Sequence, residues 1–217
     1  MSIRVLIADD HPIVRDGLRL SLARSGRDVE VVGEAADGVE VLELAKTCRT
    51  DVFILDITMP RLNGLDTARE LLKRRRTARI IILSLHDSRA LVEESMAVGA
   101  RGYLTKETAS RNVTEAVCEV YAGRFYLSPE IAQIMGERRE RGGGKGGVME
   151  PVPALTAHER RVLQLIAEGR TTKEIAADLG RAIDTIRTHR KNLMAKLAIH
   201  KETDLVRYAV KEGISKL

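Results

Sequence analysis

Five polar residues occur where buried strands are expected to end, and their types suit phosphoryl chemistry. Asp9 and Asp10 follow one apolar run, Asp56 ends a second, Ser84 ends a third and Lys106 follows a fourth. Clustered carboxylates repel one another, so they need a cation if all of them are to stay ionised. Oxygen ligands of this kind suit Mg²⁺, and an opposing lysine and hydroxyl could hold an anionic group. The set therefore predicts transfer of a phosphoryl group onto an aspartate.

The elements that must position these residues are read from two alternating patterns over the first 120 residues. Short runs rich in β-branched residues alternate with segments of helical period, and the runs cover residues 3–8, 29–33, 52–55, 80–83 and 102–104. Five strands alternating with helices predict a doubly wound, five-stranded parallel sheet covered on both faces, in the α/β class. Functional residues of such sheets collect just beyond the carboxyl ends of the strands. The predicted chemistry and the predicted fold therefore agree.

The same residues resemble a response-regulator receiver domain over residues 3–120. The resemblance is carried by Asp9-Asp10-His11-Pro12, Asp56-Ile57-Thr58-Met59-Pro60 with Gly64, Leu83-Ser84 and Gly102-Tyr103-Leu104-Thr105-Lys106. It implies that Asp56 is the phosphoacceptor, assisted by Lys106 and Ser84, and that Ser84 and Tyr103 form a switch pair. It also implies that Mg²⁺ is held by Asp9, Asp10, Asp56 and the backbone carbonyl of Thr58. We expect His11 to be a neighbour of this acidic pocket and not a metal ligand, because no second His or Cys has suitable spacing nearby.

A glycine-rich segment divides the chain, and the excess of positive charge lies in the residues that follow it. Residues 142–147 hold five glycines and are followed by Pro151 and Pro153, which predicts a flexible linker over 122–153. The predicted domains are then 1–121 and 154–217. The net charge of the chain is +5, and residues 155–217 carry 13 Lys and Arg against 8 Asp and Glu. This excess indicates a nucleic-acid-facing domain behind a nearly neutral one.

The second domain reads as helical throughout, with a helix-turn-helix pattern. A capping box at Thr156 and Glu159 begins one helix, and further helices are predicted over 172–179, 183–198 and about 202–211. Ile183, Ile186, Leu193 and Leu197 mark an inward face of the third helix, which leaves a basic face for the major groove. Residues 154–214 are similar to the LuxR-type DNA-binding domain. That likeness implies groove contacts by Arg187, Thr188 and Lys191, phosphate contacts by Lys173 and Arg190, and dimer contacts through the last helix.

Length and composition exclude several other classes. No apolar run of the 217 residues approaches the roughly 18 that a membrane helix needs, and 44% hydrophobic residues is too many for a disordered chain. Cys48 and Cys118 lack CxxC spacing, which argues against a disulfide scaffold or a zinc ribbon. We therefore expect a cytoplasmic protein with no membrane partner.

Together the two resemblances identify the chain as a member of the NarL/LuxR subfamily of response regulators. They imply a transcriptional regulator of a two-component system, with a sensor histidine kinase, promoter DNA and a homodimer promoted by phosphorylation as partners. Contact with RNA polymerase stays open. The chain is not expected to be an enzyme beyond assisting its own phosphorylation and dephosphorylation.

Two rival functions remain at this stage. A phosphoaspartyl phosphatase acting on an external substrate would use the same Asp56 and Mg²⁺ chemistry, but Thr58 stands where a second aspartate would serve as general acid. A constitutive DNA-binding regulator would use its receiver only as a phosphorylation-independent dimerisation scaffold. A scaffold would not need the carboxylates, the hydroxyl and the lysine that end the predicted strands, so their presence argues against this second function.

Overall fold

A computed structural model describes residues 2–140, 155–197, 199, 201–212 and 214–215. The chain divides into two compact units, Met1–Gly144 and Lys145–Leu217, which are described separately below. The predicted glycine-rich stretch at 142–147 lies outside the described residues. Among the described helices, none combines the length and apolar character needed to cross a bilayer.

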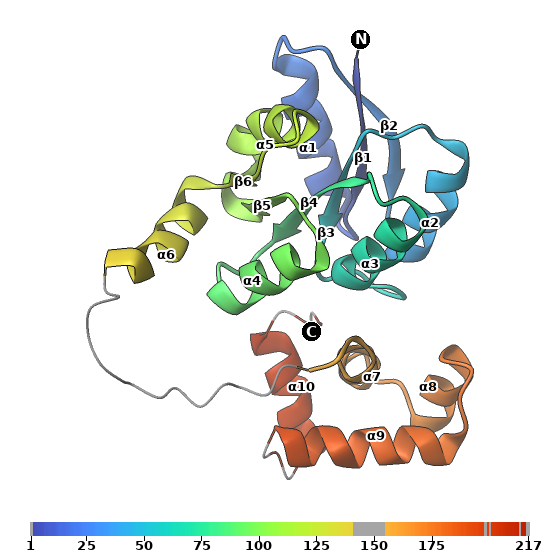
Figure 1. The fold of residues 1–217 in the computed structure, drawn as a ribbon. Helices are drawn as coiled ribbons and strands as arrows, with labels where there is room; N and C mark the ends of the chain where they lie inside the picture. The colour runs from blue at the N-terminus through green and yellow to red at the C-terminus, as the bar shows by residue number, and fades with distance from the viewer. Residues whose placement is uncertain (1, 141–154, 198, 200, 213, 216–217) are drawn as a thin grey trace. The chain divides into compact units, whose positions relative to one another are not determined.

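The first unit is built on a parallel sheet in the strand order β2-β1-β3-β4-β5-β6 (Figure 1). Its strands are β1 (Ile3–Ala8), β2 (Val29–Ala35), β3 (Val52–Asp56), β4 (Arg79–Ser84), β5 (Gly102–Thr105) and β6 (Tyr126–Leu127). The central strands β1, β3 and β4 are almost wholly buried, as their uninterrupted apolar runs predict. The α/β class and the parallel sheet are thus confirmed.

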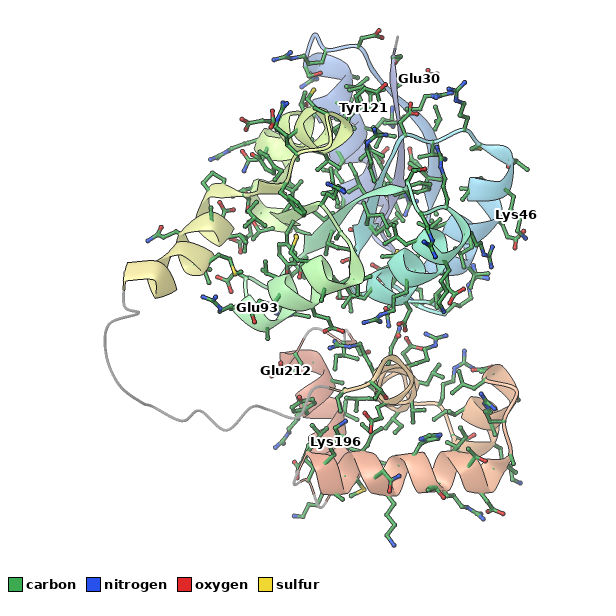
Figure 2. The ribbon with its side chains drawn as sticks, viewed as in Figure 1. Glu30, Lys46, Glu93, Tyr121, Lys196 and Glu212 are labelled. Carbon is green, nitrogen blue, oxygen red and sulfur yellow. The ribbon has the colours of Figure 1, made fainter. Side chains whose placement is uncertain are left out.

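Helices cover both faces of this sheet, and alternate strand residues feed two separate hydrophobic clusters. The helices are α1 (Pro12–Arg24), α2 (Gly38–Thr47), α3 (Gly64–Arg74), α4 (Arg89–Val98) and α5 (Lys106–Tyr121). Val5, Ile7 and Ile54 pack with α1 and α5, whereas Leu6 and Phe53 pack with α2, α3 and α4. Figure 2 shows side chains filling the space between the sheet and these helices. Burial on both faces holds the strand ends in fixed positions.

The sheet has six strands and not the five predicted. Strand β6 pairs with β5 in parallel, and α6 (Pro129–Glu140) follows it and buries Ile131 in the cluster of α2, α3 and α4. The pattern missed β6 because only two residues pair, at a sheet edge, and a run this short has no readable period. The carboxylate of Glu130 accepts hydrogen bonds from Thr105 and Thr108, which fixes the start of α6 beside β5.

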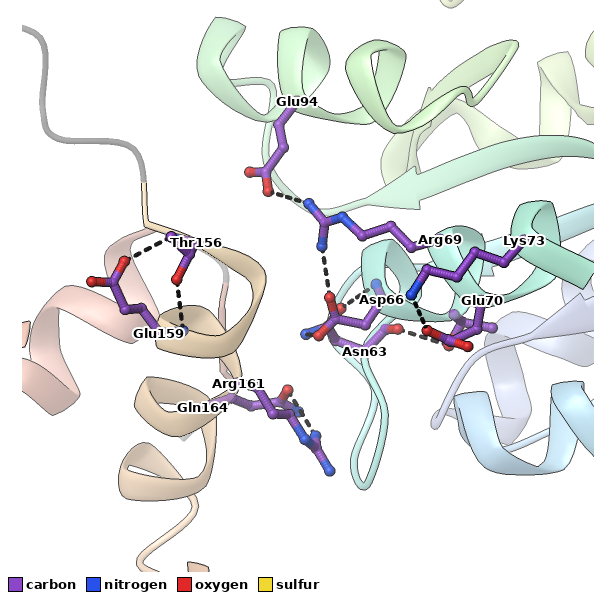
Figure 3. A network of polar contacts seen from close by, with 11 residues as sticks. Asn63, Asp66, Arg69, Glu70, Lys73, Glu94, Thr156, Glu159, Arg161 and Gln164 are labelled. Carbon is purple, nitrogen blue, oxygen red and sulfur yellow. Dashed lines mark hydrogen bonds and ion pairs between the residues drawn. The ribbon is translucent and has the colours of Figure 1, made fainter. Parts of the chain in front are cut away.

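The second unit consists of the helices α7 (Ala157–Ala167), α8 (Thr172–Asp178), α9 (Ile183–Lys196) and α10 (Glu202–Lys211). The predicted capping box is present: the Glu159 N–H donates to Thr156 Oγ1 over 3.2 Å, and the Thr156 N–H donates to Glu159 Oε2 over 2.8 Å (Figure 3). Ile186 and Leu193 of α9 are buried in the core, as expected. Ile183 was also predicted to face inward, but it lies in the first turn of α9 and is 38% exposed.

Gly64 lets α3 begin directly against the end of β3. A Cβ atom at this position would lie 2.2 Å from the backbone oxygen of Asp56, whereas a Cβ at Gly17 in α1 would meet no atom within 4 Å. The close approach at Gly64 therefore has no room for a side chain, and it holds the segment that follows the buried Asp56.

We predict that Gly64→Ala lowers the free energy of unfolding of the first unit by about 1–3 kcal/mol, because the backbone beside Asp56 must move. Gly17→Ala is the matched control and should raise stability by up to about 1 kcal/mol, since alanine is the better helix former. Urea denaturation followed by circular dichroism measures both. Equal stability of the two variants would contradict the close approach.

Candidate functional site

The predicted polar residues meet at the carboxyl edge of the sheet. Asp9 follows β1, Asp56 ends β3, Ser84 ends β4, and Lys106 is the first residue of α5 directly after β5. Strand β2 lies on one side of β1, and β3 and the later strands lie on the other, so the strand order reverses between β1 and β3. Open α/β sheets bind ligands in the crevice that such a reversal leaves.

The ammonium group of Lys106 joins two buried carboxylates. Its Nζ atom lies 2.5 Å from Asp9 Oδ2 and 2.8 Å from Asp56 Oδ2. The side chains of Asp9 and Asp56 are at most 1% exposed, and that of Lys106 is 6% exposed. Buried charges of like sign need a close counter-charge, and Lys106 supplies it for both carboxylates. The structure thus brings Asp9, Asp56 and Lys106 together as predicted.

Asp10 and His11 form the outer part of the acidic cluster. His11 Nδ1 lies 2.8 Å from Asp10 Oδ1 and 3.3 Å from Asp9 Oδ1, and the His11 N–H donates to Asp9 Oδ1 over 2.9 Å. Arg15 donates to the backbone carbonyl of Asp9 over 2.7 Å, a contact the sequence does not reveal because its acceptor is a main-chain atom. His11 is therefore a neighbour of the pocket, as expected, although one ring nitrogen is close enough to join a ligand set.

The donor atoms of this edge include the carboxylates that a hard divalent cation prefers, and the ligand atoms of Asp9, Asp10 and His11 lie within 4.8 Å of one another. Asp9, Asp10 and Asp56 offer three carboxylates, and Thr58, 8% exposed, follows Asp56 two residues later. One ammonium group does not balance three carboxylates, so the cluster keeps an excess of negative charge near its half-exposed member, Asp10. Carboxylate and carbonyl oxygens are the ligands that Mg²⁺ prefers.

Ser84 and Tyr103 hold the same loop after β4. The N–H of His86 donates to Ser84 Oγ over 3.0 Å, and the Tyr103 hydroxyl donates to the carbonyl of His86 over 2.7 Å. Both side chains are buried. Burial raises the pKa of Tyr103 to about 12, against the opposite effect of its hydrogen bond with Ser84. Ser84 and Tyr103 therefore both contact the backbone of His86. The sequence does not predict these contacts, because His86 uses only main-chain atoms in them.

A polar network links helix α3, which follows Asp56 in the sequence, to helix α4. The Asp66 N–H donates to Asn63 Oδ1 over 2.8 Å, which caps the start of α3. Arg69 then donates to Asp66 Oδ1 over 2.6 Å and to Glu94 Oε1 of α4 over 3.0 Å (Figure 3). The segment from Asp56 to α3 is consequently held at both ends.

In the second unit, α9 presents a basic face. Arg187, Thr188 and Lys191 are exposed, and so is Lys173 on α8. Arg187 lies 2.9 Å from Asp184 one turn earlier, and Thr188 donates to the backbone carbonyl of Asp184 over 2.9 Å. Ala182 precedes the helix without a side-chain cap, as its type predicts. Such a face has the charge and the hydrogen-bond donors for phosphates and base edges.

Arg190 differs from Arg187 and Lys191 because, like Lys196 with Glu159 of α7, it has partners on other helices of the unit. It donates to Thr172 Oγ1 of α8 over 3.0 Å and forms an ion pair with Glu202 of α10. Its side chain is 17% exposed, and burial lowers its pKa. Sequence periodicity places Arg190 at the border of the face but does not reveal these partners, since they lie on other helices.

Comparisons with known proteins cover both units. Residues 5–118 match the response regulator receiver domain, and residues 153–209 match the luxR family of bacterial regulatory proteins. The chain is 39% identical to the transcriptional regulatory protein MctR of Rhizobium johnstonii, over 98% of this chain and 95% of that protein. It is 38% identical to the transcriptional regulatory protein UhpA of Escherichia coli, over 94% and 96% respectively.

Solved structures give the same result. One structure of the Salmonella typhimurium response regulator RcsB aligns with a TM-score of 0.73 at 26% identity, covering 97% of this chain and 98% of that one. Another, of RcsB bound to a promoter in the presence of a phosphomimetic, aligns with a TM-score of 0.71 at 28% identity, covering 96% and 98%. With its receiver residues gathered at one sheet edge and a LuxR-type domain behind them, this chain belongs to the NarL/LuxR subfamily of response regulators.

Proposed function

We propose that this response regulator is switched by transfer of a phosphoryl group from a sensor histidine kinase to Asp56. The observation that carries the proposal is the buried ammonium of Lys106, 2.8 Å from Asp56 and 2.5 Å from Asp9. In the transfer, a carboxylate oxygen of Asp56 forms a bond to phosphorus while the bond between phosphorus and the histidine nitrogen breaks. Lys106 stands where it can balance charge on the transferred oxygens.

Asp9, Asp10, Asp56 and the backbone carbonyl of Thr58 would hold Mg²⁺ at this edge. When bound, the ion supplies a positive charge that shields the carboxylates from the incoming phosphoryl group. Asp9 is held by Lys106, and Asp10 is partly exposed and lies at the entrance. The same residues would assist hydrolysis of the aspartyl phosphate, in which water attacks phosphorus, the bond from phosphorus to the Asp56 oxygen breaks and inorganic phosphate leaves.

Ser84 and Tyr103 would transmit the effect of phosphorylation from Asp56 to the loop before α4. Ser84 Oγ accepts a hydrogen bond from His86 in the unphosphorylated chain and could instead donate to a phosphoryl oxygen. Its departure would free the His86 N–H while Tyr103 still holds the His86 carbonyl, so the loop before α4 would shift. We propose that this shift favours a homodimer.

Dimerisation would bring two α9 helices onto neighbouring half-sites of promoter DNA. Arg187, Thr188 and Lys191 would enter the major groove, while Lys173 and Arg190 would contact phosphates. The structure of RcsB bound to a promoter in the presence of a phosphomimetic supports promoter binding in the phosphorylated state for a similar chain. Because its proposed partner is promoter DNA, we propose that the chain acts in the cytoplasm.

The phosphorylation proposal predicts the intact mass after incubation with acetyl phosphate and Mg²⁺. The native chain should gain one phosphoryl group, because Asp56 has both a counter-charge and a metal site beside it. Asp56→Asn should gain none, and omission of Mg²⁺ should abolish the gain. Asp51→Asn is a matched control, since Asp51 pairs with Arg4 away from the site, and it should behave like the native chain. Promoter binding by Asp56→Asn equal to that of the phosphorylated native chain would favour the scaffold function instead.

The switch proposal predicts different behaviour for two tyrosines. Tyr103→Phe should still be phosphorylated but lose most of the resulting gain in DNA affinity, because its hydroxyl no longer holds His86. Tyr126→Phe should keep both properties, since its hydroxyl donates to Glu115 on α5 and not to the loop. Electrophoretic mobility shifts with and without acetyl phosphate measure the difference. A normal gain in Tyr103→Phe would contradict the proposed path.

The pH dependence of stability gives a second readout for Tyr103. A folded-state pKa near 12, above the ordinary 10, means that its contribution to stability is present below pH 10 and is lost as pH rises through 12. Absorbance titration should show less tyrosinate appearing near pH 12 in Tyr103→Phe than in the native chain.

The two arginines of α9 should differ in their effect on the stability of the second unit, because both are proposed to contact DNA but only Arg190 has partners on other helices. Arg187 is 71% exposed, so Arg187→Ala should weaken promoter binding by about 1–3 kcal/mol and leave thermal unfolding unchanged. Arg190→Ala should lower the unfolding temperature of the second unit, because Thr172 and Glu202 lose their partner. Calorimetry and fluorescence anisotropy with promoter DNA measure the two effects. An unchanged unfolding temperature in Arg190→Ala would contradict its structural role.

A further inference from the structure

Helices α1 and α5 pack side by side (Figure 1). An open groove lies on the face that they form. Its volume is about 750 Å³, and its lining comes from the C-terminal end of α1, the loop that follows, the middle of α5 and Arg124. Helices α1 and α5 both begin near the Asp56 edge, at Pro12 and Lys106, and run away from it. The groove is therefore separate from the proposed phosphorylation site.

The lining has more positive charge than its own acids neutralise. It holds four arginines and two glutamates. Glu119 pairs with Arg124 through two contacts of 2.5 and 2.7 Å, and Glu115 accepts a hydrogen bond from the hydroxyl of Tyr126. Within the part of the chain that the structure describes, Arg24, Arg27 and Arg111 form no ion pair with a carboxylate. Three guanidinium groups, from α1, the loop after it and α5, thus line one hollow that contains one further carboxylate, that of Glu115, and the lining keeps an excess of positive charge.

Hydroxyl groups complete the lining. Ser21 and Ser25 already donate to backbone carbonyls of α1, whereas Ser110 and Thr114 of α5 form no hydrogen bond with the described residues. Guanidinium groups bind phosphate through two parallel hydrogen bonds, and free hydroxyls add further donors. A volume of this size lies in the range of small-molecule sites.

We propose that this groove binds a small molecule that carries two or more phosphate groups. Three guanidinium groups spread around one hollow suit several linked anionic groups better than a single phosphate. DNA is a poorer fit, because residues 1–120 hold 18 Lys and Arg against 19 Asp and Glu, so this part of the chain has no net positive charge to attract a long polyanion. This inference does not depend on the proposed phosphorylation.

The test is isothermal titration calorimetry of the full chain with inorganic tripolyphosphate as the probe. We expect one site per chain, and Arg111→Ser should weaken the affinity by roughly tenfold, with a further loss in Arg24→Ser/Arg111→Ser. Arg76→Ser is the matched control, because this exposed arginine follows α3 outside the groove, and it should bind like the native chain. Thermal unfolding of each variant checks that the exposed substitutions leave the fold intact.

Three results would overturn the proposal. Absence of a binding heat at millimolar tripolyphosphate would remove the site, and equal weakening by Arg76→Ser would reduce it to diffuse charge attraction. Orthophosphate binding as tightly as tripolyphosphate would remove the requirement for several phosphates. Sedimentation velocity distinguishes a further possibility: if Arg111→Ser changes the oligomeric state and tripolyphosphate does not bind, the groove is an interface between copies of the chain.

Discussion

The ion pairs of Lys106 with Asp9 and Asp56 are the constraint on which the receiver depends. Two carboxylates that are almost completely buried repel each other, and removing Lys106 would take away their shared counter-charge. The pairing requires β1, β3 and β5 to end at one edge, because each of the three residues is fixed to the end of one of these strands. The strand order and the two apolar clusters on either face of the sheet satisfy that requirement.

The part of this arrangement that the sequence predicts is the part encoded locally. Uninterrupted apolar runs mark β1, β3 and β4, polar residues directly after them mark the edge, and the capping box at Thr156 and Glu159 marks a helix start. These signals depend on neighbours in the chain, so one sequence is enough to read them. Strand β6 and the ion pair of Arg190 with Glu202 depend on residues that are distant in the sequence, and neither produces a periodic pattern of residue types.

Glu130 illustrates why such contacts matter despite being unreadable in sequence. Burial alone would raise the pKa of this carboxylate, but hydrogen bonds from Thr108, its own backbone and Thr105 outweigh burial, and the pKa is lowered. Thr105 is the last residue of β5 and precedes Lys106, so α6 is fastened to the same strand end that carries the buried ammonium. A displacement of β5 would therefore act on two features at once, the acceptor pocket and the helix through which the chain leaves the sheet.

The helix α9 divides its basic residues between holding the domain and facing outward. Arg190 joins α8, α9 and α10, and the energetic cost of its partial burial is offset by two hydrogen-bonding partners. Arg187 is exposed and, among the residues that the structure describes, pairs with Asp184 alone, and exposed pairs of this kind contribute little to stability. The weakness of that pair is useful for recognition, since a guanidinium held loosely by one carboxylate can exchange it for a phosphate or a base edge at small cost.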